Sequence, residues 1–149
     1  MQKRLFYIIF TLATLCFSEC GEYKDNNNDE TEVTASDFAM AYFNYDFSKA
    51  ATLATDDSRK WLEFEASNIT DGDIQTLRDA EGGAIVEVNS STTEGDEATV
   101  EMTVKNFLYT DSIGKPGRMV EGKVITVKLK KQADGKWKVR MEAPLRSGK

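Results

Sequence analysis

Residues 123–141 read KVITVKLKKQADGKWKVRM, and this stretch decides the fold. Apolar and polar residues alternate on both sides of Asp134-Gly135, with Ile125, Val127, Leu129, Trp137, Val139 and Met141 in the apolar phase. Such alternation is typical of strands buried on one face, and Asp-Gly between two alternating runs is a strong hairpin signal. The stretch therefore predicts an antiparallel hairpin with Val127 and Trp137 in the core and with Lys136 and Lys138 exposed.

Two more strands are indicated upstream of this hairpin. Val86 and Val88 alternate in a first strand, and a second strand has Val100, Met102, Val104 and Leu108 in one phase. Val120, Gly122 and Val124 are out of phase with Ile125 and the apolar residues that follow it. We expect a β-bulge near Lys123 or Val124 to reset the phase and bend the strand.

Helical signals fill the half of the chain before these strands. We expect Ser36 to cap a largely buried first helix with Phe38, Tyr42 and Tyr45 on one stripe. Further helices are predicted to start at Asp46, at Thr55 or Asp56, and at Thr70 or Asp71, with Gly82-Gly83 ending the last. Helices followed by hairpin-linked strands indicate an α+β domain, with N-terminal helices packed in the concave face of a curved four-stranded antiparallel meander.

Two motifs are similar to those of a known group of proteins. FAMAYFNYDFSKAATLATDDS at residues 38–58 and DGKWKVRM at residues 134–141 resemble segments of small bacterial lipoproteins of unknown function. These proteins have a nuclear-transport-factor-2-like, or cystatin-like, cone, and the resemblance covers roughly residues 34–143. The fold also occurs in ketosteroid isomerases, dehydratases and non-catalytic binding modules, so function has to be argued from a site.

The N-terminus is typical of an export signal. Lys3 and Arg4 precede an apolar run over residues 5–17, which is too short to cross a bilayer core of about 30 Å. Cys20 follows and resembles the acylated cysteine of bacterial lipoproteins, so it is the expected lipid attachment site. Cleavage after Cys20, which would give a free secreted protein, remains an alternative.

The domain organisation follows from these features. We expect residues 1–19 to be a signal peptide and residues 20–33, which are charged and asparagine-rich, to be a flexible tether. Residues 34–149 then form a single α+β domain. The expected location is the cell envelope, as a membrane-anchored lipoprotein.

Composition excludes several kinds of chemistry. The chain has no histidine, and its two cysteines, Cys16 and Cys20, lie in or at the end of the signal. Histidine-based acid/base catalysis, a Ser-His or Cys-His nucleophile and the usual zinc clusters are therefore excluded. The formal net charge of −6 argues against a nucleic-acid partner. We expect no cofactor and no metal ion.

Carboxylates and tyrosines remain for proton chemistry. Asp46 follows Tyr42 by one helical turn, and a buried aspartate beside a tyrosine would resemble an isomerase site. The competing interpretation is that Asp46 caps the second helix, which would make it a poor base. We favour the cap and assign no catalytic residue.

A ligand pocket could be lined by six residues. These are Tyr42, Tyr45, Trp61, Met102, Asn106 and Met141. Asn106 is the one polar residue in the inward phase of its strand, where it could orient a ligand inside the cone. The methionines and Trp61 could line an adaptable apolar pocket, or they could fill a core.

Two functions from different classes are consistent with these residues. The leading hypothesis is a non-enzymatic, lipid-anchored binding or scaffold domain of the bacterial cell envelope, acting through its sheet face or the mouth of the cone. Its partners would be the membrane, through the N-terminal lipid, and a small apolar ligand or an envelope protein. The rival is a small isomerase- or dehydratase-like enzyme that uses an Asp-Tyr pair on an apolar substrate. An exposed Asp46 bonded to helix amides would remove the rival's only base.

Overall fold

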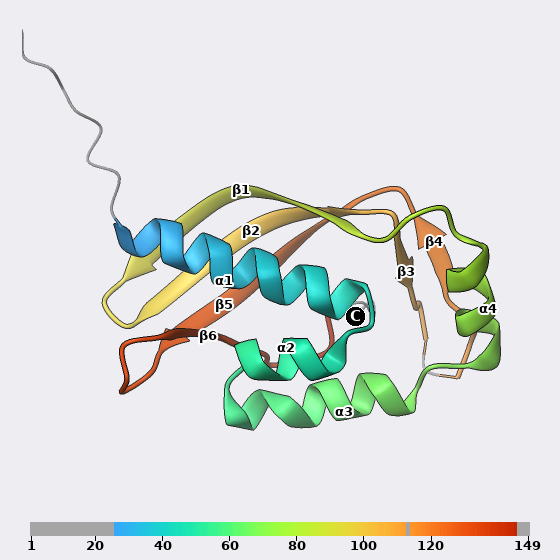
Figure 1. Ribbon diagram of the computed structural model, residues 1–149, viewed down its shortest axis with the longest axis horizontal. Helices are drawn as coiled ribbons and strands as arrows, with labels where there is room; N and C mark the ends of the chain where they lie inside the picture. Colours follow the sequence, from blue (N-terminus) through green and yellow to red (C-terminus); the bar gives the residue numbers. More distant parts are fainter. Residues whose placement is uncertain (1–25, 113, 146–149) are drawn as a thin grey trace, which may run out of the picture.

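The structure, a computed structural model, describes residues 26–112 and 114–145 (Figure 1). The signal peptide, Cys20 and the first residues of the expected tether lie outside the described residues. The helices are α1 (Asn26–Phe43), α2 (Phe47–Leu53), the short 3-10 helix η1 (Asp56–Ser58), α3 (Arg59–Ser67) and α4 (Asp71–Asp79). The strands are β1 (Ile85–Glu94), β2 (Glu97–Lys105), β3 (Phe107–Tyr109), β4 (Arg118–Val120), β5 (Lys123–Lys131) and β6 (Trp137–Arg140).

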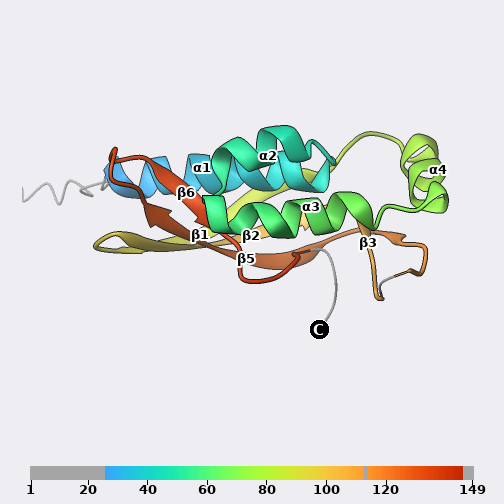
Figure 2. The same ribbon diagram turned by 90° about the horizontal axis from the view of Figure 1, so that it is seen from below.

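The main sheet has four strands in the order β1-β2-β5-β6, and all its neighbours are antiparallel. Strands β3 and β4 form a separate antiparallel pair. Helices α1, α2 and α3 lie on one face of the main sheet, while α4 and the β3–β4 pair lie together at one end (Figure 2). The predicted α+β fold class, with N-terminal helices packed against a curved four-stranded antiparallel meander, is confirmed. Within the described ranges, no helix combines the length and the apolarity that crossing a membrane requires.

Helix α1 starts earlier than the sequence predicts. It begins at Asn26, so residues 26–33, which we expected in a flexible tether, belong to the helix, and Ser36 is an interior residue, not a cap. Thr31 is fully buried, and Ser91 Oγ of β1 donates a hydrogen bond to Glu32 Oε1 at 2.5 Å. A polar composition suggested a tether, but contacts with β1 hold this turn on the sheet.

Two predicted helix starts are confirmed. Asp46 caps α2 by accepting the Lys49 amide at 3.0 Å. Thr70 caps α4 in a capping box, in which Thr70 Oγ1 accepts the Asp73 amide and Asp73 Oδ2 accepts the Thr70 amide. The third start is split, because Thr55 precedes η1 and α3 begins only after Ser58.

Hydrogen bonds between the hydroxyl groups of Thr55 and Ser58 and the backbone join the start of α3 to the end of β6. Ser58 is fully buried, and its Oγ accepts the Met141 amide at 2.8 Å and lies 2.7 Å from Thr55 Oγ1. The Thr55 hydroxyl in turn bonds Asp57, and this bond, helped by the nearby Arg140, lowers the pKa of Asp57 below its ordinary value. A lowered pKa means that the resulting stabilisation is present above the ordinary pKa and is lost as the pH falls through the lowered one.

The bend of the sheet does not arise as predicted. No bulge occurs near Lys123 or Val124, because Val104 pairs with Lys123 and Phe107 pairs with Val120 in one continuous register. The chain bends instead at Asn106, whose φ of 53° lies in the left-handed region. The register shift that the structure does show lies in β1, between Val88 and Ser90.

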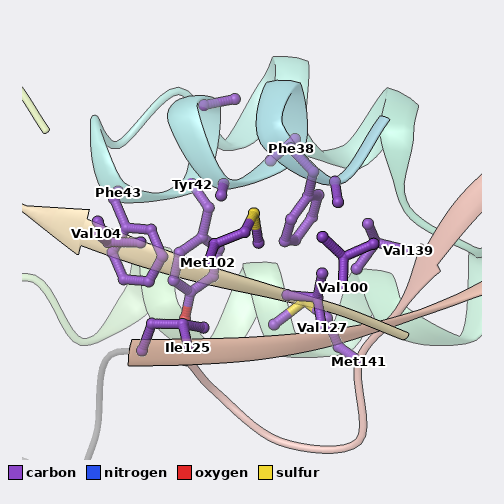
Figure 3. Packing of buried hydrophobic residues seen from close by; sticks show 14 of the residues in the cluster. Phe38, Tyr42, Phe43, Val100, Met102, Val104, Ile125, Val127, Val139 and Met141 are labelled. Atoms are coloured by element: carbon purple, nitrogen blue, oxygen red, sulfur yellow. The ribbon is translucent and has the colours of Figure 1, made fainter. Parts of the chain in front are cut away.

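The core lies between α1 and the sheet (Figure 3). Phe38, Tyr42 and Phe43 of α1 meet strand residues that include Val100, Met102, Val104, Ile125 and Val127. Val127 and Trp137 are buried and Lys136 is exposed, as predicted. Lys138 is half-buried instead of exposed.

Candidate functional site

Asp46, the only base that the enzymatic hypothesis had, is exposed and serves as a helix cap. Its Oδ1 accepts the amide of Lys49, at the step between α1 and α2. The ring of Tyr42 faces the sheet, and its hydroxyl accepts the Leu145 amide at 2.9 Å. The structure therefore does not bring Asp46 and Tyr42 together as an acid/base pair.

Four of the six predicted pocket residues belong to the core. Tyr42 and Met102 are fully buried, Met141 is 5% exposed, and Trp61 is half-buried against the same cluster. Tyr42 packs against the rings of its neighbours Phe38 and Phe43. These side chains occupy the space between the helices and the sheet, where a ligand inside the cone would have to lie.

The other two, Tyr45 and Asn106, line one hollow at the step between α1 and α2. This step hollow has a volume of about 180 Å³, and its lining includes Tyr45, Asn44, Leu77, Gly83, Asn106 and Met119. Its walls come from the α1–α2 step, α4, the segment before β1 and the bend between β2 and β3. The fold thus joins residues that lie far apart in the sequence.

Two of the segments that line the step hollow, the α1–α2 step and the bend between β2 and β3, each contain a residue with left-handed backbone conformation. Among the described residues, Tyr45 and Asn106 are the two non-glycine residues with positive φ, 65° and 53°. Tyr45 ends α1 in a Schellman turn, in which the Asp46 amide donates to Ala41 O and the Tyr45 amide donates to Tyr42 O. Glycine is the usual residue at that position, so tyrosine there costs backbone energy.

Two asparagines fasten the segment that leads into β1. Asn44 Oδ1 accepts the Ala84 amide at 2.8 Å, and Asn106 Nδ2 donates to Glu81 O and Gly83 O, both at 3.1 Å. A side chain at Gly83 would overlap the amide group of Asn44, so this close approach requires glycine. Both asparagine side chains are therefore used to build the wall of the hollow.

A larger hollow lies beside the β3–β4 pair. This hairpin hollow has a volume of about 600 Å³, and its lining includes Tyr109, Asp111, Arg118, Met119, Glu121 and Lys123. Met119 also lines the step hollow, so the two hollows are neighbours at the same end of the molecule. The larger volume lies within the range of about 300–1,000 Å³ that is usual for small-molecule sites.

Tyr109 stands at the centre of the charges in the hairpin hollow. Lys123 Nζ donates a hydrogen bond to Tyr109 Oη at 2.9 Å and lies 4.0 Å from the ring centroid. The guanidinium carbon of Arg118 is 5.8 Å from the same centroid, and Arg118 Nε contacts Asp111 Oδ2 at 3.4 Å. Two cations thus flank one tyrosine that is only 8% exposed.

A buried carboxylate holds the loop before β4 in place. Asp73 is 1% exposed, and its Oδ1 accepts the Gly117 amide at 2.6 Å while its Oδ2 accepts the Thr70 amide. The first turn of α4 is thereby attached to the β3–β4 pair.

Only some of these site residues can be identified from the sequence. Thr70 and Asp73 match the spacing of a capping box, but nothing in the sequence indicates that Asp73 also reaches Gly117. Tyr109, Arg118 and Lys123 lie in separate strands with no shared motif, so their convergence depends on the bend at Asn106. Asn44 had no signal beyond its position at the end of a helix.

The chain resembles several solved structures at low identity. A candidate NTF2-like transpeptidase from Campylobacter jejuni has 16% identity and a TM-score of 0.48, over 75% of this chain and 98% of that one. A protein of unknown function from Mycobacterium tuberculosis has 16% identity and a TM-score of 0.48, over 74% of this chain and 68% of that one. A candidate dehydratase of the NTF2-like family from Streptomyces avermitilis has 18% identity and a TM-score of 0.45, over 80% and 90%.

No protein-family model and no curated protein matches the chain. Two of these solved structures are described as NTF2-like, and at these identities the resemblance concerns architecture alone.

Proposed function

We propose that the chain is a non-enzymatic, lipid-anchored binding domain of the bacterial cell envelope, whose step hollow receives a small apolar group of a ligand or an envelope protein. The observation that carries the binding site is the position of Tyr45 and Asn106. A tyrosine in the left-handed region costs about 1–3 kcal/mol, and such strained residues are concentrated at functional sites, whereas asparagine adopts this region more readily. Here both left-handed non-glycine residues of the described part of the chain line a single hollow.

The volume of the step hollow limits what it can hold. A cavity of about 150 Å³ can hold benzene, so about 180 Å³ accommodates one ring or one apolar side chain. Tyr45, Leu77 and Met119 supply apolar surface there, while the asparagine amides are engaged with the backbone of residues 81–84. The hollow therefore suits an anchoring group of a larger partner.

The enzymatic alternative has less support in the described residues. Its aspartate is an exposed cap, and its tyrosine is a core residue that bonds Leu145. Binding without chemistry accounts for the same residues.

The lipid anchor is supported by Cys20 and by where α1 begins. From Cys20 to Asn26 is six residues, which span at most about 20 Å when fully extended. The start of α1 and the two hollows lie at opposite ends of the domain (Figure 1). An anchored domain would therefore present its hollows away from the membrane.

Substitution of Cys20 tests the anchor. In a native-like host, Cys20→Ala should abolish lipid labelling of the protein, while Cys16→Ala, the matched control, should leave labelling unchanged. Labelling of the Cys20→Ala protein would show that another residue carries the lipid.

Filling the step hollow tests the binding site. Titration of residues 21–149 with benzene should give saturable binding, observed by NMR at residues around Tyr45 and Asn106. Ala80→Leu should abolish this binding, because Ala80 lines the hollow. Ala133→Leu, at an exposed turn on the opposite end, should leave it unchanged. Equal binding by both variants would place the benzene elsewhere and refute the assignment of the hollow.

A further inference from the structure

We infer that the hairpin hollow binds a single oxyanion group, a carboxylate or a phosphate, through Lys123, Arg118 and the hydroxyl of Tyr109. The inference rests on the proposed binding function, since it gives the same end of the domain a second kind of contact. The step hollow would hold an apolar group, and the adjacent hairpin hollow would hold an acidic one. Met119 is the wall between them.

Lys123 is the principal cation of this site. It is exposed, lines the hollow, and donates a hydrogen bond to the hydroxyl of Tyr109. Among the described residues no carboxylate lies within ion-pair distance of its ammonium group. An ammonium group has three N–H donors, so two remain for a ligand after the bond to Tyr109.

Tyr109 contributes a donor because of the direction of that same bond. Lysine has no acceptor, so the phenol oxygen must accept from Lys123, and its own O–H points elsewhere. No acceptor for this proton is found in the described part of the chain. The ring is 8% exposed and is held by edge contact with Phe107, so the hydroxyl is well positioned.

Arg118 completes the set of donors. Arg118 pairs with Tyr109 across strands β3 and β4. The Arg118 guanidinium carbon lies 5.8 Å and Lys123 Nζ lies 4.0 Å from the centroid of the Tyr109 ring, so the two cationic groups are within about 10 Å of each other. Only its Nε contacts Asp111, at 3.4 Å, and both side chains are 63% exposed. Such an exposed pair is weak, so the terminal nitrogens of Arg118 remain available for a second partner.

The acidic residues of the hollow define the ligand class. Asp111 and Glu121 line it together with the two cations, so the formal charges of the lining cancel. A polyanion would meet these carboxylates as well as a chain of net charge −6. One oxyanion group attached to an otherwise neutral ligand fits this arrangement.

Calorimetric titration of the full chain in neutral detergent with acetate and with inorganic phosphate tests the inference, with acetamide as the uncharged control. Saturable binding of either anion, and no binding of acetamide, is expected. Preference for acetate would indicate a carboxylate ligand, and preference for phosphate would indicate a phosphorylated ligand.

Lys123→Met should weaken anion binding about tenfold, the equivalent of one charge-assisted hydrogen bond. Tyr109→Phe should weaken it about threefold to tenfold.

Two further variants are expected to strengthen binding or to leave it unchanged. Asp111→Asn should tighten binding severalfold, because it removes the carboxylate that pairs with Arg118. Lys105→Gln removes a cation that pairs with Glu87 instead and should change nothing. The inference is wrong if Lys105→Gln weakens binding as much as Lys123→Met does, or if neither anion binds. Neither outcome would affect benzene binding in the step hollow, so the proposed function would be judged separately.

Discussion

Trp137 is the largest side chain of β6, and its indole is buried without a hydrogen-bond acceptor for Nε1 among the described residues. A buried unsatisfied donor costs about 1–3 kcal/mol, which offsets part of the gain from burying the ring. Lys131 Nζ, 5.6 Å from the ring centroid, recovers a small part of this cost. The net contribution of this residue is therefore mainly apolar.

Trp137→Phe should accordingly be mild. It keeps much of the apolar ring and removes the unsatisfied N–H, so we expect the free energy of unfolding to change by about 1 kcal/mol or less. Trp137→Ala should lower it by about 3–5 kcal/mol. Urea denaturation measures both, and Lys136→Ala, an exposed neighbour, should change stability by about 0.5 kcal/mol or less. Comparable losses for Phe and Ala would mean that the N–H has a partner.

Asp46 contributes as a cap, and its substitution should affect stability in a graded way. Asp46→Ala leaves the Lys49 amide without its acceptor and should lower the free energy of unfolding by about 0.5–2 kcal/mol. Asp46→Asn keeps a capping oxygen and should cost only a few tenths of a kcal/mol. Thermal and urea unfolding of the two variants check this order. Equal losses in the two variants would show that the negative charge, not the hydrogen bond, matters.

At the level of elements, local signals predicted what local interactions determine. The starts of α2 and α4 were predicted from Asp46 and Thr70, because a cap acts within one turn. The alternation in β5 and β6 likewise identified the buried face, apart from Lys138. The first turns of α1 were missed because Glu32 is stabilised by Ser91, a partner 59 residues away that no local pattern reveals.

The candidate site was predicted only in part for the same reason. Asn106 and Tyr45 were identified individually from their phase and aromatic character, yet their convergence depends on two backbone conformations that the sequence does not mark. Left-handed positions usually hold glycine or asparagine, so a tyrosine at one of them gives no signal. The methionines and Tyr42 have the same pattern whether they fill a core or line a pocket.

Asp73 joins α4 to the β3–β4 pair, and its removal should loosen that end of the molecule. In the native protein, one Asp73 oxygen accepts the Gly117 amide and the other accepts the Thr70 amide. Asparagine replaces one of these oxygens with an N–H₂ group, which cannot accept, so one of the two backbone amides loses its acceptor. We expect a loss of about 2–3 kcal/mol, against little change for Asp71→Asn on the exposed side of the same turn.

Hydrogen exchange distinguishes a local effect of Asp73→Asn from a global one. The Gly117 amide should lose protection in this variant, whereas amides of β2 and β5 should lose protection only in proportion to the drop in global stability. Unchanged exchange at Gly117 would show that the loop is held by other contacts.

At the scale of the whole molecule, the start of α1 and the two hollows lie at opposite ends of an elongated domain (Figure 1). The β5–β6 turn lies at the same end of the domain as the start of α1 (Figure 1), and the Lys131 amide donates a hydrogen bond to Asp96 O of the β1–β2 turn. If Cys20 carries a lipid, as proposed, the six residues from Cys20 to Asn26 would keep this end within about 20 Å of the bilayer. Helix α4 and the β3–β4 pair, which form the opposite end of the domain, would then point away from the bilayer (Figure 1).

Fluorescence quenching by nitroxide-labelled lipids measures this orientation. Thiol-reactive dyes would be attached in membrane-anchored protein to Ala133→Cys, at the β5–β6 turn, or to Lys115→Cys, between β3 and β4; both positions are exposed. We expect stronger quenching at position 133, because its end of the domain is held near the lipid while the other end projects away. Lengthening the segment between Cys20 and Asn26 with a Gly/Ser linker should reduce the difference, since a longer linker lets the domain rotate and move away from the surface. Equal quenching at the two positions in the unmodified chain would mean that the anchor does not orient the domain, and the hollows would then have no preferred direction of approach for a partner.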